Sequence, residues 1–117
     1  MLPLIILAGP TTSNKSDTAI ELAEKINSEI ISADSMQVYK YFNIGTAKVT
    51  PADRVRIPHH LIDILEPDQE FSAFDFKTMA LAHTRELHSQ GKVPIITGGT
   101  GLYIKALCEG YDCAVQI

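Results

Sequence analysis

One run of eight residues constrains this chain more than any other: Gly-Pro-Thr-Thr-Ser-Asn-Lys-Ser, from Gly9 to Ser16. It follows an apolar run from Leu2 to Ala8 and opens a helical pattern that continues to about Asn27. A strand, a glycine-containing loop and a helix in this order form the P-loop, where backbone N–H groups and a Lys face phosphates and a Ser or Thr hydroxyl faces Mg²⁺. The spacing from Gly9 to Lys15 fits that pattern and predicts a phosphate site.

Asn14 departs from the P-loop pattern, which has glycine immediately before the Lys. Asn enters the left-handed backbone region more readily than most non-Gly residues, at some cost in energy. The loop is therefore still able to close, although the Asn14 side chain would crowd the phosphate. The alternative is a polar turn in which Ser13 or Asn14 caps an ordinary helix.

Composition points to one globular domain. The 117 residues are 45% hydrophobic and 21% charged, which is typical of a folded chain with its own core. The net charge of −4 argues against a self-sufficient nucleic-acid binder, because such proteins usually carry a basic face.

The N-terminal apolar run does not have the features of a membrane span or a signal peptide, so we expect a cytoplasmic protein. Leu2 to Ala8 is too short to span a membrane, and no Lys or Arg precedes it as in a signal peptide. Cys108 and Cys113 are too few for a disulfide framework and lack partners at metal-ligand spacing. We expect both to be free thiols in a reducing compartment.

Alternating apolar runs and helical patterns predict an α/β fold, a parallel sheet with flanking helices. The expected strands are Leu4–Ala8, Glu29–Ala33, His59–Leu65 and Val93–Thr97. The expected helices are Lys15–Asn27, a short one starting at Pro51, one capped by Ser72 and running to about Gln90, and Leu102–Glu109. The longest helix is expected to bury a stripe of Phe76, Met79, Ala80, His83 and Leu87.

Three polar turns follow three of these strands, at Gly9–Ser16, Asp34–Gln37 and Gly98–Thr100. In a parallel sheet they would share the carboxyl edge, where open α/β sheets bind ligands. Asp34 would be a general base or a carboxylate behind a metal ligand; alternatively it caps a short helix from Ser35 to Tyr39. Thr100 would donate to a substrate, cap a helix, or do both.

Other reactive or aromatic side chains have structural interpretations. His59 and His60 are assigned to strand packing rather than metal ligation, and Phe71, Phe74 and Phe76 to the core rather than to a base-stacking surface. His83 and His88 are poor candidates for a shared metal, since they do not lie on the same helix face.

Runs of residues along nearly the whole chain, including the P-loop and the turn at Asp34, together resemble the tRNA dimethylallyltransferase family, also called tRNA isopentenyltransferase. The matching runs keep the family's order and cover the chain from Leu4 to about Gly110: Gly9–Thr11 with Ser13, Lys15 and Ser16, then Glu29–Ser32, Asp34–Tyr39, Asn43–Lys48, Pro58–Asp63, Phe71–Ala73, Gly91–Pro94 and Gly98–Ile104. The resemblance implies a P-loop NTPase-like fold and a reaction. A dimethylallyl group moves from dimethylallyl diphosphate to N6 of an adenosine next to the tRNA anticodon.

The resemblance also implies roles for individual residues. The loop would bind diphosphate rather than ATP, through Gly9, Pro10, Thr11, Thr12, Ser13, Asn14, Lys15 and Ser16. Lys15 would neutralise the diphosphate, Ser16 would coordinate Mg²⁺, and Thr11 would donate to the leaving oxygen. Asp34 would accept a proton from the adenine amine. The tRNA contact would comprise Asp34, Ser35, Met36, Gln37 and Thr100.

The chain is shorter than members of this family. We interpret residues 1–112 as the N-terminal part of the P-loop core domain and 113–117 as an unmatched tail, with the helical tRNA-binding insertion and the C-terminal part absent. The expected partners are the tRNA anticodon loop and dimethylallyl diphosphate, with no membrane, and the expected state is a monomer. Two alternatives stay open: a small P-loop nucleoside or metabolite kinase, or an inactive folded fragment.

Overall fold

A parallel β-sheet forms the centre of the molecule. The computed structural model describes residues 4–8, 15–35, 38–40, 51–98, 101–108 and 113–116. In this part of the chain the sheet has five strands in the order β3-β2-β4-β1-β5, and every pairing is parallel. The strands are β1 (Leu4–Ala8), β2 (Ile30–Ser32), β3 (His59–His60), β4 (Ile95–Gly98) and β5 (Cys113–Gln116).

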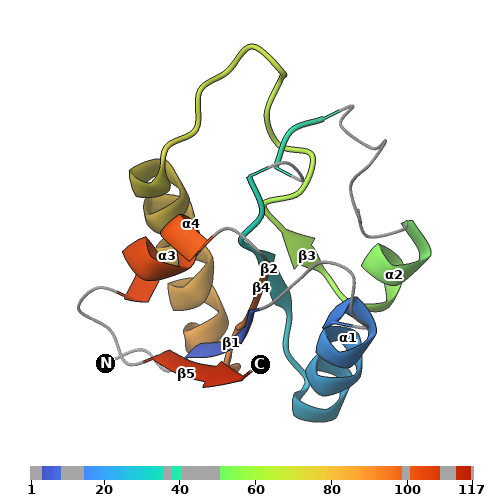
Figure 1. Ribbon diagram of the computed structural model, residues 1–117. Helices are drawn as coiled ribbons and strands as arrows, with labels where there is room; N and C mark the ends of the chain where they lie inside the picture. The colour runs from blue at the N-terminus through green and yellow to red at the C-terminus, as the bar shows by residue number, and fades with distance from the viewer. Residues whose placement is uncertain are drawn as a thin grey trace.

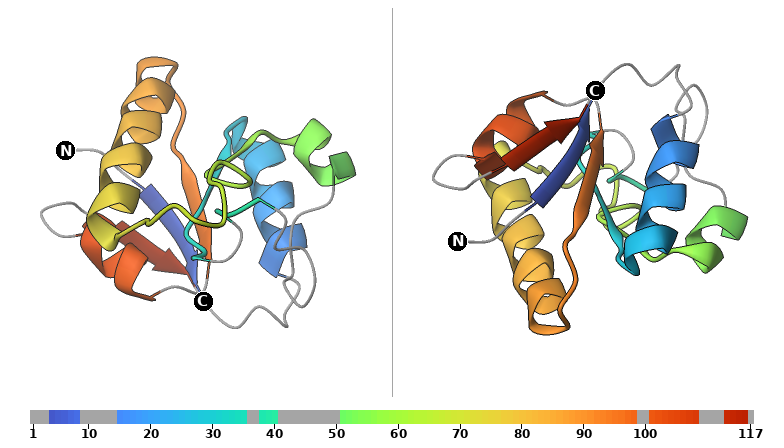
Figure 2. Two further views of the ribbon diagram at one scale, coloured as in Figure 1. Left: turned by 90° about the horizontal axis from the view of Figure 1, so that it is seen from above. Right: turned by 90° about the horizontal axis from the view of Figure 1, so that it is seen from below.

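Helices cover both faces of this sheet, as Figures 1 and 2 show. Helices α3 (Ala73–Ser89) and α4 (Gly101–Cys108) pack on one face, and α1 (Lys15–Ile26) and α2 (Pro51–Arg56) lie on the other. Successive strand residues point to opposite faces, so Ile31 joins the α3 and α4 core while Ile30 joins the α1 core. Burial on both faces explains why β1 is apolar throughout and why β2 and β4 each begin with two isoleucines. The predicted α/β sheet with flanking helices is confirmed.

Both ends of α3 are encoded by local sequence. The Asp75 N–H donates to the Ser72 Oγ (3.1 Å) and the Ser72 N–H donates to an Asp75 carboxylate oxygen (2.9 Å), which together form a capping box. At the other end Gly91 has a φ of 74°, and its N–H donates to the carbonyl of His88. The predicted Ser72 cap is therefore confirmed.

The buried face of α3 differs from the predicted stripe. Phe76, Ala80 and Leu87 are buried as expected, but Met79 is 36% exposed and His83 is only half-buried. The remaining buried positions on α3 are Leu81 and Thr84. Thr84 was overlooked because it is polar. Its hydroxyl donates to the Ala80 carbonyl at 2.8 Å, which satisfies the group inside the core.

Phe74 is not part of the core. It is 74% exposed, whereas Phe76 is 1% exposed and Phe71 packs against the core from its edge. The core assignment was wrong for Phe74 because its position on α3 points it away from the sheet.

The third strand is shorter than predicted. β3 contains only His59 and His60, because Leu61 (φ 65°) and Asp63 (φ 57°) adopt left-handed backbone conformations that interrupt an extended strand. Parallel pairing resumes in an isolated bridge between Tyr39 and Leu65. That bridge places Tyr39 in an extended pairing rather than at the end of a short helix.

The strand β5 was not among the expected elements. It pairs in parallel with β1, with Leu4 opposite Cys113 and Leu7 opposite Gln116. Cys108 at the end of α4 is disulfide-bonded, so the expectation of a free thiol is wrong for this residue. Within the described ranges, no helix combines the length and apolar character needed to cross a membrane.

Candidate active site

Three strands end level with one another at the carboxyl edge of the sheet. β4 lies between β1 and β2, and Ala8 pairs with Gly98 while Ser32 pairs with Thr97. The chain therefore leaves all three strands at the same edge. This is the position at which ligands bind in open α/β sheets.

The start of α1 is fixed at this edge by packing. α1 begins at Lys15, shortly after the end of β1, and its residues Ala19, Ile20 and Ala23 are buried against the sheet. The first N–H groups of a helix lack partners within the helix and carry partial positive charge, so this end favours an anion. Lys15 and Ser16 thus lie in the first turn of a helix that begins at the carboxyl edge of the sheet.

Asp34 follows β2 at the same edge and is half-buried. The preceding residue, Ala33, is fully buried and donates its N–H to the Thr97 carbonyl at 2.6 Å. This hydrogen bond continues the β2–β4 pairing beyond Ser32. The backbone that leads into Asp34 is therefore fixed to β4, and the half-buried Ser35 follows it.

A buried aromatic side chain, Tyr103 of α4, lies near Asp34. Burial raises the pKa of Tyr103, and the nearby Tyr39, Asp34 and Asp75 raise it further. The Tyr103 ring is 6% exposed and stacks on Phe76 with centroids 4.8 Å apart. Its hydroxyl donates to the Phe71 carbonyl at 3.3 Å. Tyr103 therefore links α4 and α3 beside the carboxyl edge, a role that sequence reasoning missed although the residue lies one turn after the Gly98–Thr100 turn.

Several predicted site residues lie outside the described part of the chain. These are Gly9, Pro10, Thr11, Thr12, Ser13, Asn14, Met36, Gln37 and Thr100. Of the predicted residues that are described, the structure brings the start of α1 and Asp34 to one edge of the sheet.

The histidines lie among structural contacts. His59 Nδ1 is 2.6 Å from the Ile57 carbonyl, and burial lowers the pKa of this imidazole. His60 Nε2 is 2.7 Å from Glu29 Oε1, and its ring stacks on His83 with centroids 4.3 Å apart. Among the residues that the structure describes, no group of three His, Cys, Asp or Glu side chains is arranged to hold a metal ion.

Comparison with known proteins identifies the family. A protein-family profile described as "IPP transferase" matches residues 37–116, which is most of the chain. The chain belongs to the IPP transferase family. The family match includes β5 and the whole of α3, β4 and α4.

Relatives in this family share both sequence and fold with the chain. A tRNA dimethylallyltransferase of Staphylococcus aureus (strain JH9) is 58% identical over 109 residues, which are 93% of this chain and 35% of the relative. The crystal structure of a tRNA delta(2)-isopentenylpyrophosphate transferase from Staphylococcus epidermidis is 54% identical with a TM-score of 0.87, covering 92% of this chain and 35% of that one. The full-length tRNA isopentenylpyrophosphate transferase from Bacillus halodurans is 43% identical with a TM-score of 0.89, covering 96% and 37%.

These comparisons confirm the resemblance to tRNA dimethylallyltransferases and the P-loop NTPase-like fold class. The chain spans about a third of the length of the curated relatives that it matches: 35% of the Staphylococcus aureus protein.

Proposed function

We propose that the carboxyl edge of this sheet serves tRNA dimethylallyl transfer, from dimethylallyl diphosphate to N6 of an adenosine next to the anticodon. The observation that carries the proposal is the level ending of β1, β4 and β2, which brings the start of α1 and Asp34 to one edge. The 58% identity to a tRNA dimethylallyltransferase supports the reaction class.

The leaving diphosphate is proposed to bind at the start of α1, held by the loop from Gly9 to Ser16. Lys15 neutralises its charge and Thr11 donates to the oxygen that leaves. Negative charge develops on that oxygen as the C–O bond breaks, so donors fixed at this point stabilise the transition state more than the ground state.

Asp34 is proposed to act on the adenine. The exocyclic nitrogen forms a bond to the first carbon of the dimethylallyl group while the bond from that carbon to diphosphate breaks, and the nitrogen passes its proton to the Asp34 carboxylate. An adenosine in the anticodon loop reaches this position only when it is turned out of the stack. Ser35, Met36, Gln37 and Thr100 are the proposed contacts for the displaced nucleotide.

The residues at this edge fit a magnesium ion held mainly by substrate. Mg²⁺ in phosphate sites is commonly bound by one or two protein ligands together with phosphate oxygens and water. Ser16, in the first turn of α1, is the proposed ligand. When bound, Mg²⁺ supplies positive charge to the diphosphate.

The proposal extends to organisation and setting. Residues 1–112 are proposed as the N-terminal part of the P-loop core domain, in a monomeric, cytoplasmic protein. The support is the sequence pattern, together with relatives whose names describe action on tRNA.

Thermal melting of the chain with pyrophosphate and Mg²⁺ tests the diphosphate site. A ligand that binds only the folded state stabilises it by about 2.7 kcal/mol at a hundredfold excess over Kd, so we expect a higher Tm. The variant Lys15→Met should lose most of the shift, whereas Glu24→Gln, on an exposed part of α1, should keep it. A cooperative melt without any shift, or no cooperative melt, would reject a diphosphate site in this chain.

Transfer of labelled dimethylallyl from its diphosphate to unmodified tRNA tests the reaction. Label on an adenosine next to the anticodon is the expected product. Transfer of the γ-phosphate from ATP to a nucleoside, without prenyl transfer, would replace the proposal with a small P-loop kinase.

A further inference from the structure

Gly98, the last residue of β4, approaches the backbone of Ala33, directly after β2, more closely than any side chain would permit. It is buried and has a φ of 153°, a conformation that L side chains rarely adopt. A Cβ built at Gly98 would lie 2.2 Å from the Ala33 carbonyl oxygen and 2.5 Å from its carbon. Both distances are far shorter than van der Waals contact, and both atoms belong to the backbone, which cannot rotate aside.

The contact lies at the peptide that leads into Asp34. The Ala33 carbonyl is one end of the peptide bond whose other end is the Asp34 nitrogen. On its other side, Ala33 is held by the hydrogen bond from its N–H to Thr97, the residue before Gly98. Two consecutive residues of β4, Thr97 and Gly98, therefore contact Ala33, the residue directly before Asp34.

We propose that Gly98 is a positioning residue, which sets the place of the Asp34 carboxylate by letting β4 approach the Ala33 carbonyl. The inference rests on the proposed role of Asp34 as the base. A side chain at position 98 would push the Ala33–Asp34 peptide away from β4. It would leave the Asp34 carboxylate intact but displaced from the adenine.

Two other glycines provide matched controls. Gly91 also has positive φ (74°) but no atom lies within 4 Å of a Cβ built there, so Gly91→Ala adds backbone strain without a contact. Gly101, the first residue of α4, has ordinary φ and equally open surroundings. Gly101→Ala therefore adds a methyl group without either effect, and Gly98→Ala alone adds both.

Amide spectra of the isotope-labelled chain test the positioning directly. In Gly98→Ala, we expect the amide signals of Ala33, Asp34 and Ser35 to move and the Ala33 amide to exchange faster with solvent. In Gly91→Ala and Gly101→Ala these signals should stay in place, even though Gly91→Ala lowers the Tm through backbone strain. Unchanged signals in a folded Gly98→Ala chain would overturn the proposal.

If Gly98→Ala does not fold, the close approach can still be tested by nuclear magnetic resonance on the unaltered chain. Close approach predicts a strong nuclear Overhauser effect between the Gly98 α-protons and Ala33, and a scalar coupling from the Ala33 nitrogen to the Thr97 carbonyl. Absence of both in well-resolved spectra would overturn the proposal without any variant.

Kinetics distinguish positioning from a general loss of stability. Gly98→Ala should lower kcat for prenyl transfer about 100-fold, the cost expected for a reacting group misplaced by about 1 Å, while KM for dimethylallyl diphosphate stays unchanged. Gly91→Ala should keep the kcat of the unaltered chain. Equal kcat in Gly98→Ala and Gly101→Ala would contradict positioning. If the unaltered chain transfers no prenyl group, the proposed function fails, and the amide signals still decide the role of Gly98.

Discussion

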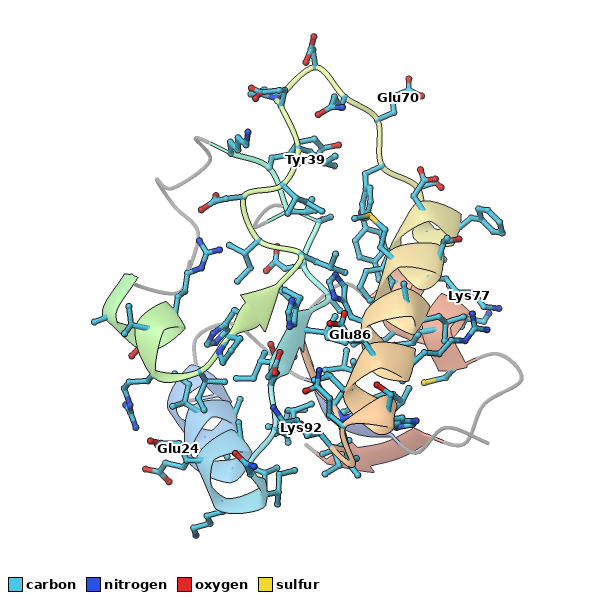
Figure 3. The ribbon with its side chains drawn as sticks, turned by 180° about the vertical axis from the view of Figure 1, so that it is seen from behind. Glu24, Tyr39, Glu70, Lys77, Glu86 and Lys92 are labelled. Carbon is cyan, nitrogen blue, oxygen red and sulfur yellow. The ribbon has the colours of Figure 1, made fainter. Side chains whose placement is uncertain are left out.

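The two edges of the sheet are built in different ways. At the amino edge, the Glu29 carboxylate accepts from His60 Nε2 (2.7 Å) and Lys92 Nζ (3.1 Å), and the Ser28 hydroxyl donates to the Val93 carbonyl (2.6 Å). At the carboxyl edge, backbone contacts from β4 fix the chain just before Asp34. In Figure 3, Tyr39 lies above the strands and Lys92 lies below them.

This difference suggests that the amino edge contributes mainly to stability, while the carboxyl edge carries the proposed site. The side chains of the amino edge neutralise one another across β2, β3 and the start of β4, so their charge serves stability. At the carboxyl edge, the contacts from Thr97 and Gly98 to Ala33 fix the backbone that leads into Asp34, the proposed base. Variants at the amino edge should therefore change stability without changing turnover, whereas Asp34 variants should lower turnover.

Asp34→Ala should have the largest effect. Removing a general base lowers kcat by about 10²- to 10⁴-fold, and pyrophosphate affinity should hardly change because the proposed diphosphate site is separate from Asp34. Steady-state prenyl transfer and pyrophosphate titration give the two values. Asp68→Ala, which removes an exposed carboxylate from a loop, is the control. Normal turnover in Asp34→Ala would rule out its role as the base.

Glu29→Gln should have the largest effect at the amino edge. The change removes the charge that accepts from both His60 and Lys92, in a side chain only 16% exposed. Hydrogen bonds to charged groups contribute about 1.5–3 kcal/mol, so we expect a loss in that range from the free energy of unfolding in urea. The kcat of the folded fraction should be unchanged. A fall in kcat at full stability would mean that the amino edge also contributes to catalysis.

Acidification should reduce the contribution of the amino edge to stability in two steps, one at His83 and one at Glu29. Burial and the neighbouring His60 lower the pKa of His83 below 6.5, so its share of stability is complete above that pH and is lost as pH falls toward the lowered value. Burial would raise the pKa of Glu29, but the hydrogen bonds from His60 and Lys92 outweigh it and hold the pKa below 4.5. The share of Glu29 is therefore present above pH 4.5 and lost below it.

Urea unfolding across this pH range checks both steps. His83→Gln should flatten the loss of stability that begins near the ordinary histidine pKa of 6.5, and Glu29→Gln should flatten the loss below 4.5. Identical pH profiles in the two variants and the unaltered chain would contradict the assignment.

Glu24→Gln should have the smallest effect. Glu24 pairs with Arg56, but the two side chains are 47% and 51% exposed. Exposed pairs contribute about 0–1 kcal/mol, so the urea midpoint should hardly move. The chemical change equals that in Glu29→Gln, so the difference between the two variants measures what burial and the second partner of Glu29 add together. Equal losses would remove the distinction between an edge contact and a surface contact.

Much of the fold could be predicted because its signals are local. Apolar runs marked β1, β2 and β4, and the Ser72 cap and Gly91 marked the ends of α3. The early end of β3 could not be predicted, because Leu61 is not a residue type that favours the left-handed backbone conformation it adopts. The exposure of Phe74 depends equally on how α3 packs against the sheet.

The candidate site divides along the same line. Asp34 was predictable, since a carboxylate directly after a buried strand of a parallel sheet falls at the ligand-binding edge. The importance of Gly98 was not, because it depends on the distance between β4 and the Ala33 carbonyl. The sequence pattern predicted that Asp34 lies at the carboxyl edge, and the tertiary structure showed which backbone contacts fix the chain just before it.

The position of β4 between β1 and β2 has a consequence for synthesis on the ribosome. β1 and β2 emerge first, yet neither pairs with the other, because the place between them belongs to a strand translated much later. Parallel pairings that close such long loops form slowly. A nascent chain therefore carries Lys15 and Asp34 for some time as separate segments, and the two come to one edge of the sheet in a late step, when β4 inserts.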